Sequence, residues 1–278
     1  MPGRLQWGLF FVGLVLVGCS QNPPPIQEAK KVAPLDGPKP AVEISPAARP
    51  AVSEPAAKQI LDDAIAAHTD KQPALLDKFK AAKVTREGPA SIGTPVPVPQ
   101  KWQLTTAWPD RFKVRAELPG PQIVNLGWTG QIGWRQGGLS DKLPMSTTEV
   151  NDFRIDVTGD WLILLFPFND PEARVAMAPE MTVRNRPATA IRFWHPLLAN
   201  AVLAFDKETK LLAQISFDGR ELGRPVTKEF VIYETRTLHG VKVPTQFVLK
   251  SNGNQLADWT VAALDLIPTV DPKLFEQP

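Results

Sequence analysis

The chain has 278 residues, with 31 basic and 29 acidic side chains and a formal net charge of +2. Nucleic acids and anionic membrane surfaces are bound by clustered Lys and Arg, so this scattered, nearly neutral charge argues against both as partners. The hydrophobic fraction of 43% suits a globular core. The single cysteine excludes a disulfide within the chain.

The first residues have the features of a secretory signal peptide. Arg4 supplies the positive charge, and residues 9–17 are a short apolar run, below the roughly 18 residues that span a bilayer. The run ends in Leu16-Val-Gly-Cys19, which resembles the site that bacterial lipoprotein signal peptidase recognises. We predict a signal peptide over 1–18 and acylation of Cys19, by palmitate among other chains. The alternative is an uncleaved signal anchor with a chance cysteine.

Residues 19–54 are predicted to be the lipidated N-terminus and a Pro-rich tether. Residues 20–55 contain nine prolines and no aromatic side chain, so the segment cannot offset its ordering entropy by burial. It is expected to hold the following domain away from the membrane in an extended form. Ser20 after the cysteine favours the periplasmic side of the outer membrane over the inner membrane.

The predicted folded domain covers 55–278 and begins with helices. Ser53 is a plausible N-cap, and Pro55 suits a first helical turn. Apolar residues then recur at helical spacing up to His68, and a short second helix is expected around Leu75–Phe79.

From residue 81 the sequence pattern is typical of antiparallel strands. Residues 111–118 alternate between charged and apolar, which predicts a strand with one solvated face. Residues 124–134 read as a hairpin with its turn at Thr129-Gly130. Further turn signals separate the strand-like runs 199–206, 211–218, 226–236, 244–251 and 255–266.

One helix interrupts the strands. Ser146-Thr-Thr-Glu149 is a capping box, and apolar residues follow at spacings of three and four. Gly159 weakens this helix by about 1 kcal/mol, and Pro167 is expected to stop it. The order is therefore helices, about four strands, a helix and six or more strands, which predicts an α+β domain with a large antiparallel sheet.

This order resembles the lipoprotein-localisation superfamily of outer-membrane lipoprotein carriers and receptors. The resemblance is carried by Trp108-Pro-Asp-Arg-Phe112, Phe205-Asp-Lys-Glu-Thr-Lys-Leu211, Tyr233 to Pro244, and Asp271-Pro-Lys-Leu-Phe275. It implies an incomplete β-barrel, a large curved sheet around an apolar hollow, with the helices as a lid. Family members bind acyl chains or lipidated proteins there. The arginine that ties the carrier's lid shut cannot be placed in this chain.

Catalytic and metal chemistry has little support. The three histidines, His68, His195 and His239, lack the spacing of a helical metal site, and no cysteine is available beyond Cys19. Phosphate-binding, dinucleotide-binding and hydrolase motifs are absent. Asp156, Asp160 and Asp170 are not required by their spacing to form a cluster. We therefore expect no enzyme activity, no cofactor, no metal and no catalytic residue.

Aromatic residues provide the candidate binding site. Either they are ordinary core, or several of them line a hollow between sheet and helices. The candidate lining residues are Trp102, Phe112, Trp128, Trp134, Trp161 and Phe193. A second candidate is the loop 137–145, whose Leu139, Leu143 and Met145 could contact a membrane or a partner, or fold back onto the helix.

Two functions follow from these features. The first is an anchored envelope protein, expected to be a monomer, that binds a lipid, an acyl chain or a lipidated protein. The alternative is a non-catalytic envelope sensor or interaction module without a small ligand. The aromatic residues and the family resemblance motivate the first function. The long tether motivates the alternative, as does the resemblance, since the superfamily also includes the sensor domain of a periplasmic anti-sigma regulator.

Overall fold

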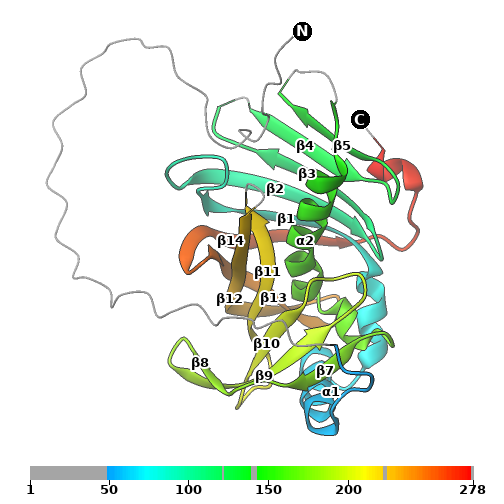
Figure 1. Cartoon of the computed structure of the whole chain (residues 1–278), viewed down its shortest axis with the longest axis vertical. Coiled ribbons are helices and arrows are strands. Elements are labelled where there is room, and N and C mark those ends of the chain that lie inside the picture. The colour runs from blue at the N-terminus through cyan, green and yellow to red at the C-terminus, as the bar shows by residue number, and fades with distance from the viewer. Residues whose placement is uncertain (1–48, 121, 139–142, 222–223, 277–278) are drawn as a thin grey trace, which may run out of the picture.

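One curved antiparallel sheet organises the molecule. The structure is a computed structural model that describes residues 49–120, 122–138, 143–221 and 224–276. Within these ranges fourteen strands form a sheet that curves without closing (Figure 1). Its order is β6-β5-β4-β3-β2-β1-β14-β13-β12-β11-β10-β9-β7, and β8 pairs with β9 beside this row.

The strands follow chain order across most of the sheet, as expected for a meander. Six of them precede the inserted helix, where the sequence indicated about four. One of the additional strands is β6, whose two residues are too few to show the alternation of apolar and polar side chains typical of a strand. The bounds of the strands are β1 Ala81–Ala90, β2 Val98–Ala107, β3 Arg111–Glu117, β4 Ile123–Trp128, β5 Gly133–Gly137, β6 Leu143–Pro144, β7 Arg174–Met177, β8 Met181–Val183, β9 Arg186–Trp194, β10 Ala201–Asp206, β11 Leu212–Glu221, β12 Arg224–Leu238, β13 Val241–Ser251 and β14 Asn254–Leu266.

The alternation in β3 shows how sequence sets the two faces of the sheet. Phe112, Val114 and Ala116 are buried, whereas the charged residues between them are partly exposed. Successive side chains of a strand point to opposite faces, so the apolar set faces the inside of the curve. Cross-strand partners continue this face, since Phe112 pairs with Thr106 of β2 and with Trp128 of β4.

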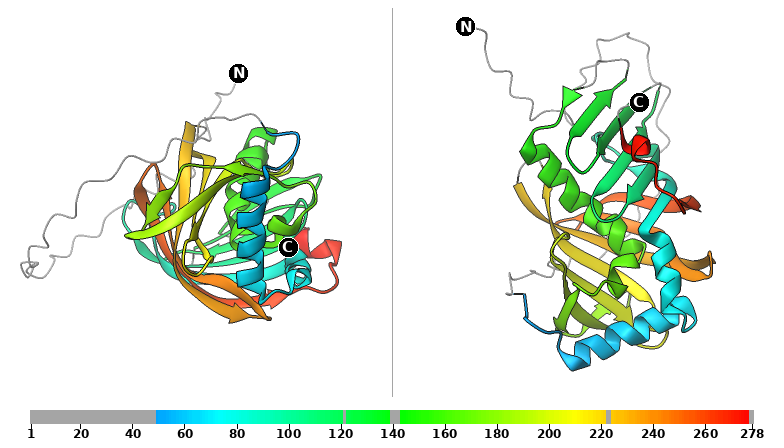
Figure 2. Two further views of the ribbon diagram at one scale, coloured as in Figure 1. Left: turned by 90° about the horizontal axis from the view of Figure 1, so that it is seen from below. Right: turned by 90° about the vertical axis from the view of Figure 1, so that its right-hand side faces the viewer.

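Helix α1 (Pro55–Thr69) packs across one end of the sheet, against β7, β9 and β13 (Figure 2). Its N-cap is Glu54, not Ser53 as predicted. Neither side chain caps the helix, because both accept hydrogen bonds from backbone amides of β7. The Ser53 hydroxyl accepts the amide of Val175, and the Glu54 carboxylate accepts that of Met177. The expected second helix is the 3₁₀ helix η1 (Pro73–Lys80).

Helix α2 (Thr147–Ile163) lies inside the curve of the sheet (Figures 1 and 2). The predicted capping box is confirmed. The Ser146 hydroxyl accepts the amide of Glu149, and the Glu149 carboxylate accepts the amide of Ser146. Leu165 then takes a left-handed conformation, and the 3₁₀ helix η2 (Phe166–Asn169) follows, so the helix ends just before Pro167 as expected.

The outer, convex face is covered in places by short segments. The C-terminal 3₁₀ helix η3 (Pro272–Phe275) packs on β3 and receives a hydrogen bond from the Trp134 indole to its Phe275 carbonyl at 2.9 Å. A small cluster that includes Val183 and Val231 packs between β8 and the neighbouring strands.

The predicted α+β class is confirmed: an open, curved antiparallel sheet with N-terminal helices and one inserted helix. Among the described residues, no helix has the length and apolarity needed to cross a bilayer. Cys19, Ser20 and most of the proposed tether lie outside the described residues, so the signal, anchor and domain boundaries stay predictions.

Candidate ligand site in the hollow of the sheet

The concave face of the sheet is apolar and is covered by α2. Aliphatic and aromatic side chains from strands far apart in the sequence form one continuous cluster there, including Leu203, Phe217, Phe230, Phe247 and Trp259. On the side of β3 and β4, Phe112 packs with Val157 and Trp161 of α2. The helix therefore occupies the space in which the family resemblance placed a ligand.

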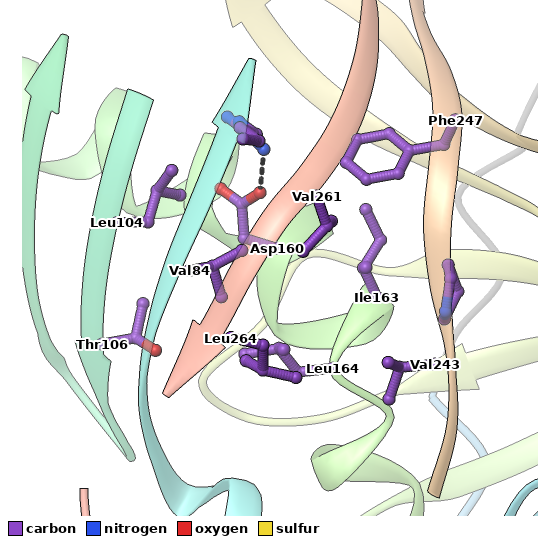
Figure 3. Close-up of a pocket in the computed structure, with 12 residues that line it drawn as sticks. Val84, Leu104, Thr106, Asp160, Ile163, Leu164, Val243, Phe247, Val261 and Leu264 are labelled. Carbon is purple, nitrogen blue, oxygen red and sulfur yellow. Dashed lines mark hydrogen bonds and ion pairs between the residues drawn. The ribbon is translucent and has the colours of Figure 1, made fainter. Parts of the chain in front are cut away.

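A small cavity remains between α2 and strands β1, β2, β13 and β14. Its volume is about 20 Å³, enough for about one water molecule. Pockets for drug-sized ligands have roughly 300–1,000 Å³, so an acyl chain does not fit while α2 is in place. The cavity is lined by Val84, Arg86, Leu104, Thr106, Asp160, Ile163, Leu164, Val243, Pro244, Phe247, Val261 and Leu264 (Figure 3).

Gly159 allows α2 to lie close to the sheet. A Cβ atom at this position would stand 2.2 Å from Cε2 of Phe230 and 2.9 Å from Cε1 of Phe217. The glycine was expected only to weaken the helix. Its tertiary role is to admit two stacked phenyl rings, whose centroids are 6.0 Å apart.

Four carboxylates run along one side of α2, and each pairs with a cation of the sheet. We call Glu149, Asp152, Asp156 and Asp160 the acidic seam; their spacing places them on one stripe of the helix. Glu149 pairs with Arg135 of β5, Asp152 with Arg220 of β11 at 3.4 Å, Asp156 with Lys228 of β12 at 2.7 Å, and Asp160 with Arg86 of β1 at 2.5 Å. The helix is thus held in the hollow by ion pairs as well as by apolar packing.

Arg86 is the most enclosed cation of this interface. Only 5% of its surface is exposed, and its guanidinium lies 5.3 Å from the ring centre of Trp102 and 5.1 Å from that of Trp259. The register of β1 against β14 shifts between Thr85 and Arg86, and such bulges re-aim side chains. Nη1 holds Asp160, whereas the buried Nε has no hydrogen-bond partner among the described residues.

Two carboxylates of the seam, Asp156 and Asp160, are costly to ionise where they lie. Burial raises the pKa of Asp156 to about 6, against the attraction of Lys228, and the nearby charges of Asp160 and Glu221 raise it further. Burial also raises the pKa of Asp160, and Arg86 and Lys228 oppose this shift. The ion pairs therefore offset a desolvation cost and contribute little net stability.

An open groove lies where α2 crosses the ends of β11 and β12. Its volume is about 480 Å³, and it is lined by Ile155, Asp218, Gly219, Arg220, Pro225, Val226, Thr227 and Asn252. Burial raises the pKa of Asp218 in this groove. Because Arg220 also pairs with Asp152 of the seam, the groove adjoins the ionic contacts of α2.

The six candidate lining residues have different places, and none of them lines the 20 Å³ cavity. Trp102 and Phe112 are on the concave face, and Trp128 packs beside Phe112. Trp161 is on α2, and Phe193 of β9 packs on Phe168 with ring centres 5.8 Å apart.

Trp134 is on the convex face. It pairs with Gly127 of β4, one residue out of step with Trp128, and its indole bonds to η3. The part of all six residues in binding a ligand stays a prediction.

The candidate contact loop is only partly described. Leu139 lies outside the described residues. Leu143 in β6 is 40% exposed, whereas Met145 is partly buried and its amide bonds to the Gly133 carbonyl. Contact of this loop with a membrane or partner stays a prediction.

Asp170, Glu172 and His195 could in principle hold a metal ion, since one ligand atom from each lies within 4.8 Å of the others. The amide of Leu197 donates to Nδ1 of His195, so the proton of the neutral ring is on Nε2. Nε2 faces Asp170 at 3.4 Å. A histidine that ligates through one nitrogen normally donates from the other, so this arrangement favours a histidine–carboxylate contact over a metal site.

The acidic seam was not predicted from the sequence. Its signal was available in the sequence as four carboxylates at spacings of three and four along the predicted helix. The cations that pair with these carboxylates could not be predicted, because they come from four strands up to 74 residues away in the chain.

Comparisons with known proteins give similar folds at low sequence identity. No family model matches the chain, and no curated protein sequence matches it. A LolA superfamily protein from Nitrosomonas europaea is 10% identical over 80% of this chain and 97% of its own, with a TM-score of 0.49.

Two further solved structures are similar to the same degree. An outer membrane lipoprotein-sorting protein domain from Vibrio parahaemolyticus is 10% identical over 79% of this chain and 96% of its own, with a TM-score of 0.47. A DUF1329 family protein from Desulfovibrio piger is 13% identical over 79% of this chain and 97% of its own, also with a TM-score of 0.47. The function is therefore argued from the residues of this chain.

Proposed function

We propose that the protein is a membrane-anchored envelope lipoprotein whose domain binds a lipid, an acyl chain or a lipidated protein in the hollow of the sheet. In the structure described above α2 fills this hollow. Binding then requires α2 to withdraw, and the apolar tail of the ligand takes the place of the helix.

The observation that carries this proposal is the contrast between the hollow and the helix that fills it. The walls of the hollow are apolar and aromatic, whereas α2 presents four carboxylates to the sheet along its length. Buried ion pairs contribute little net stability compared with apolar packing of the same volume. The apolar walls therefore suit the chain of a ligand, whereas the charges that α2 leaves on the sheet must be met by its headgroup or by water.

The apolar chain of a ligand would offset the packing that α2 loses. Transfer of a 16-carbon chain from water to an apolar site is favourable by on the order of 10 kcal/mol before the costs of binding. Part of this must replace the packing of Val157, Trp161 and Leu162 that α2 loses. At about 1.5–3 kcal/mol for each buried aliphatic side chain, the gain and the loss are of similar size.

Native mass spectrometry and organic extraction of the purified protein test the proposal. The mature chain, residues 19–278 with Cys19→Ser, is the appropriate sample because it carries no acyl chain of its own. We expect co-purified lipid, or uptake of an added apolar fluorescent probe. The absence of both rejects lipid binding and favours the sensor or interaction module, for which the filled hollow is the supporting observation.

Gly159→Ala provides an opened form for the same assay. Its Cβ would collide with the Phe230 ring, so α2 is expected to move away from the sheet. Uptake of the probe should then rise several-fold. Asn151→Ala, on an exposed position of the same helix, is the control and is expected to leave uptake unchanged.

The anchor is tested separately in cells. The native chain is expected in the membrane fraction with a mass shift for acyl chains on Cys19, and the Cys19→Ser chain is expected to leave that fraction. Recovery of both chains from the membrane would contradict the lipid anchor.

A further inference from the structure

We propose that the ligand of the hollow carries an oxyanion on its acyl chain, and that Arg86 binds this headgroup in the place now taken by the Asp160 carboxylate. This inference rests on the proposed function and specifies its ligand class. Asp160 is then an internal substitute for the ligand.

The placement of Arg86 is the first argument. Its side chain projects from the floor of an apolar hollow, between the indole rings of Trp102 and Trp259, and is almost fully buried. A buried arginine without a counter-charge is strongly unfavourable. Whenever α2 withdraws with Asp160, another anion must therefore approach Arg86 or the hollow must fill with water.

The unused donor is the second argument. Guanidinium groups prefer to bind a carboxylate or phosphate through two parallel N–H bonds. Here Nη1 bonds to Asp160 at 2.5 Å, and the buried Nε has no partner among the described residues. The Asp160 carboxylate thus accepts from only one of the guanidinium nitrogens that point into this site. A ligand headgroup, which is not tied to a helix, could accept from two of them.

The charge left on the sheet is the third argument. Withdrawal of the acidic seam separates Arg86 and Lys228 from their carboxylate partners, with Glu221 as a nearby negative charge. Lys228 is close enough to act on Asp160 as well as on Asp156, so two cations serve one anionic position. A neutral lipid would leave this excess charge uncompensated, whereas an anionic lipid would neutralise part of it.

The side chains around the residual cavity are of the kinds that this ligand needs near its head. Asp160 and its ion pair lie at one side of a group of apolar side chains, which includes Leu264, Val243 and Leu164 (Figure 3). An oxyanion at Asp160 would therefore have its first methylene groups among aliphatic walls. The rest of the chain would follow the space vacated by α2.

Three 16-carbon probes test the inference: palmitate, hexadecyl phosphate and hexadecanol, each titrated below its aggregation limit into the mature chain with Cys19→Ser. We expect one or both anions to bind at least about tenfold more tightly than the alcohol, the difference typical of charge-assisted hydrogen bonds. Comparison of the two anions separates a carboxylate ligand from a phosphate ligand. Equal binding of all three would overturn the inference and leave the proposed function standing.

Two variants assign the preference to the ion pair. Arg86→Met with Asp160→Leu replaces both charges by apolar groups and is expected to lower the anion-to-alcohol ratio to about one while the alcohol still binds. Asp160→Asn weakens the internal competitor and is expected to tighten anion binding several-fold, so it keeps the test open if the double variant misfolds. An unchanged ratio in both variants would overturn the assignment.

The control is an ion pair on the other face of the same sheet. Arg115→Met with Glu117→Leu removes a half-exposed pair of β3 and is expected to leave the ratio as in the native chain. If none of the three probes binds either the native chain or Gly159→Ala, the proposed function fails, and the inference fails with it.

Discussion

Two buried ionisable residues, His68 and Asp156, make the stability of this protein depend on pH in opposite directions. His68 is held neutral between α1 and the sheet: its Nδ1 hydrogen donates to the Lys242 carbonyl, and its Nε2 accepts the Leu212 amide at 2.9 Å. Asp156 is held in the seam beside Lys228. Each residue changes the number of protons that the folded protein binds.

His68 is expected to weaken the fold in mild acid. Burial lowers its pKa from 6.5 to about 4, so the unfolded chain binds the proton more tightly than the folded chain. Its contribution is complete above pH 6.5 and is lost as the pH falls towards 4. Urea unfolding of the native chain and of His68→Gln at pH 4 to 7 measures this, and the variant should lack this part of the decline. Parallel curves would contradict the assignment.

Asp156 is expected to act in the reverse sense. Its folded pKa of about 6 lies above the ordinary 3.8, so the folded chain binds the proton more tightly. The free energy of unfolding therefore falls as the pH rises from about 4 to 6, by this residue's share. Asp156→Asn should remove this residue's contribution to the pH dependence. The free energy of unfolding of the variant, relative to the native chain, should therefore be higher at pH 7 than at pH 4. A constant difference between the two chains would show that Asp156 does not titrate in this range.

At the scale of elements, α2 is the part on which the proposed function depends. The capping box, a local feature of the sequence, fixes where the helix begins. Its position against the sheet is fixed by contacts of the acidic seam and Gly159 with distant strands. The first turn of the helix is therefore stabilised by its own residues, whereas its position depends on the sheet.

Loss of the cap should weaken α2 by a measurable amount. Ser146→Ala removes the hydroxyl that accepts the Glu149 amide at 3.2 Å, and such losses cost about 1 kcal/mol. We expect a lower urea midpoint and faster hydrogen exchange of the α2 amides. Thr147→Ala, at the next and exposed position, is the control. Indistinguishable midpoints for the two variants would show that the capping box contributes nothing to the stability of α2.

At the scale of the whole molecule, the sheet has two faces with different tasks. The concave face, with Trp102 and Trp259, surrounds α2, whereas the convex face is sealed in part by η3 over Trp134. Aromatic residues therefore lie on both faces, around α2 on the concave face and beneath η3 on the convex face.

Trp134→Phe tests this division. The variant loses the indole bond to the Phe275 carbonyl, so the free energy of unfolding should fall by about 1 kcal/mol. Its affinity for palmitate should not change, because the side chain does not face the hollow. Trp102→Leu is the matched change on the concave face, and it should weaken palmitate binding. A loss of affinity in Trp134→Phe would return this residue to the candidate site.

Local signals in the sequence were enough to predict most of the elements. The alternation of residues 111–118 gave β3, the hairpin around Thr129-Gly130 gave β4 and β5, and Ser146 with Glu149 gave the start of α2. These features depend on neighbours within a few residues, so they can be read without knowing the fold. The lipidation of Cys19 is likewise a local signal, and it stays a prediction.

The site itself was decided by tertiary structure. Sequence alternation separates the two faces of a strand but does not tell which face the sheet curves around, so Trp134 could not be separated from Trp102. The partners of the acidic seam come together only because β1, β5, β11 and β12 surround one helix. The sequence by itself determined an α+β chain with a predicted anchor, and the curvature of the sheet decided that Arg86 and Asp160 meet inside its hollow.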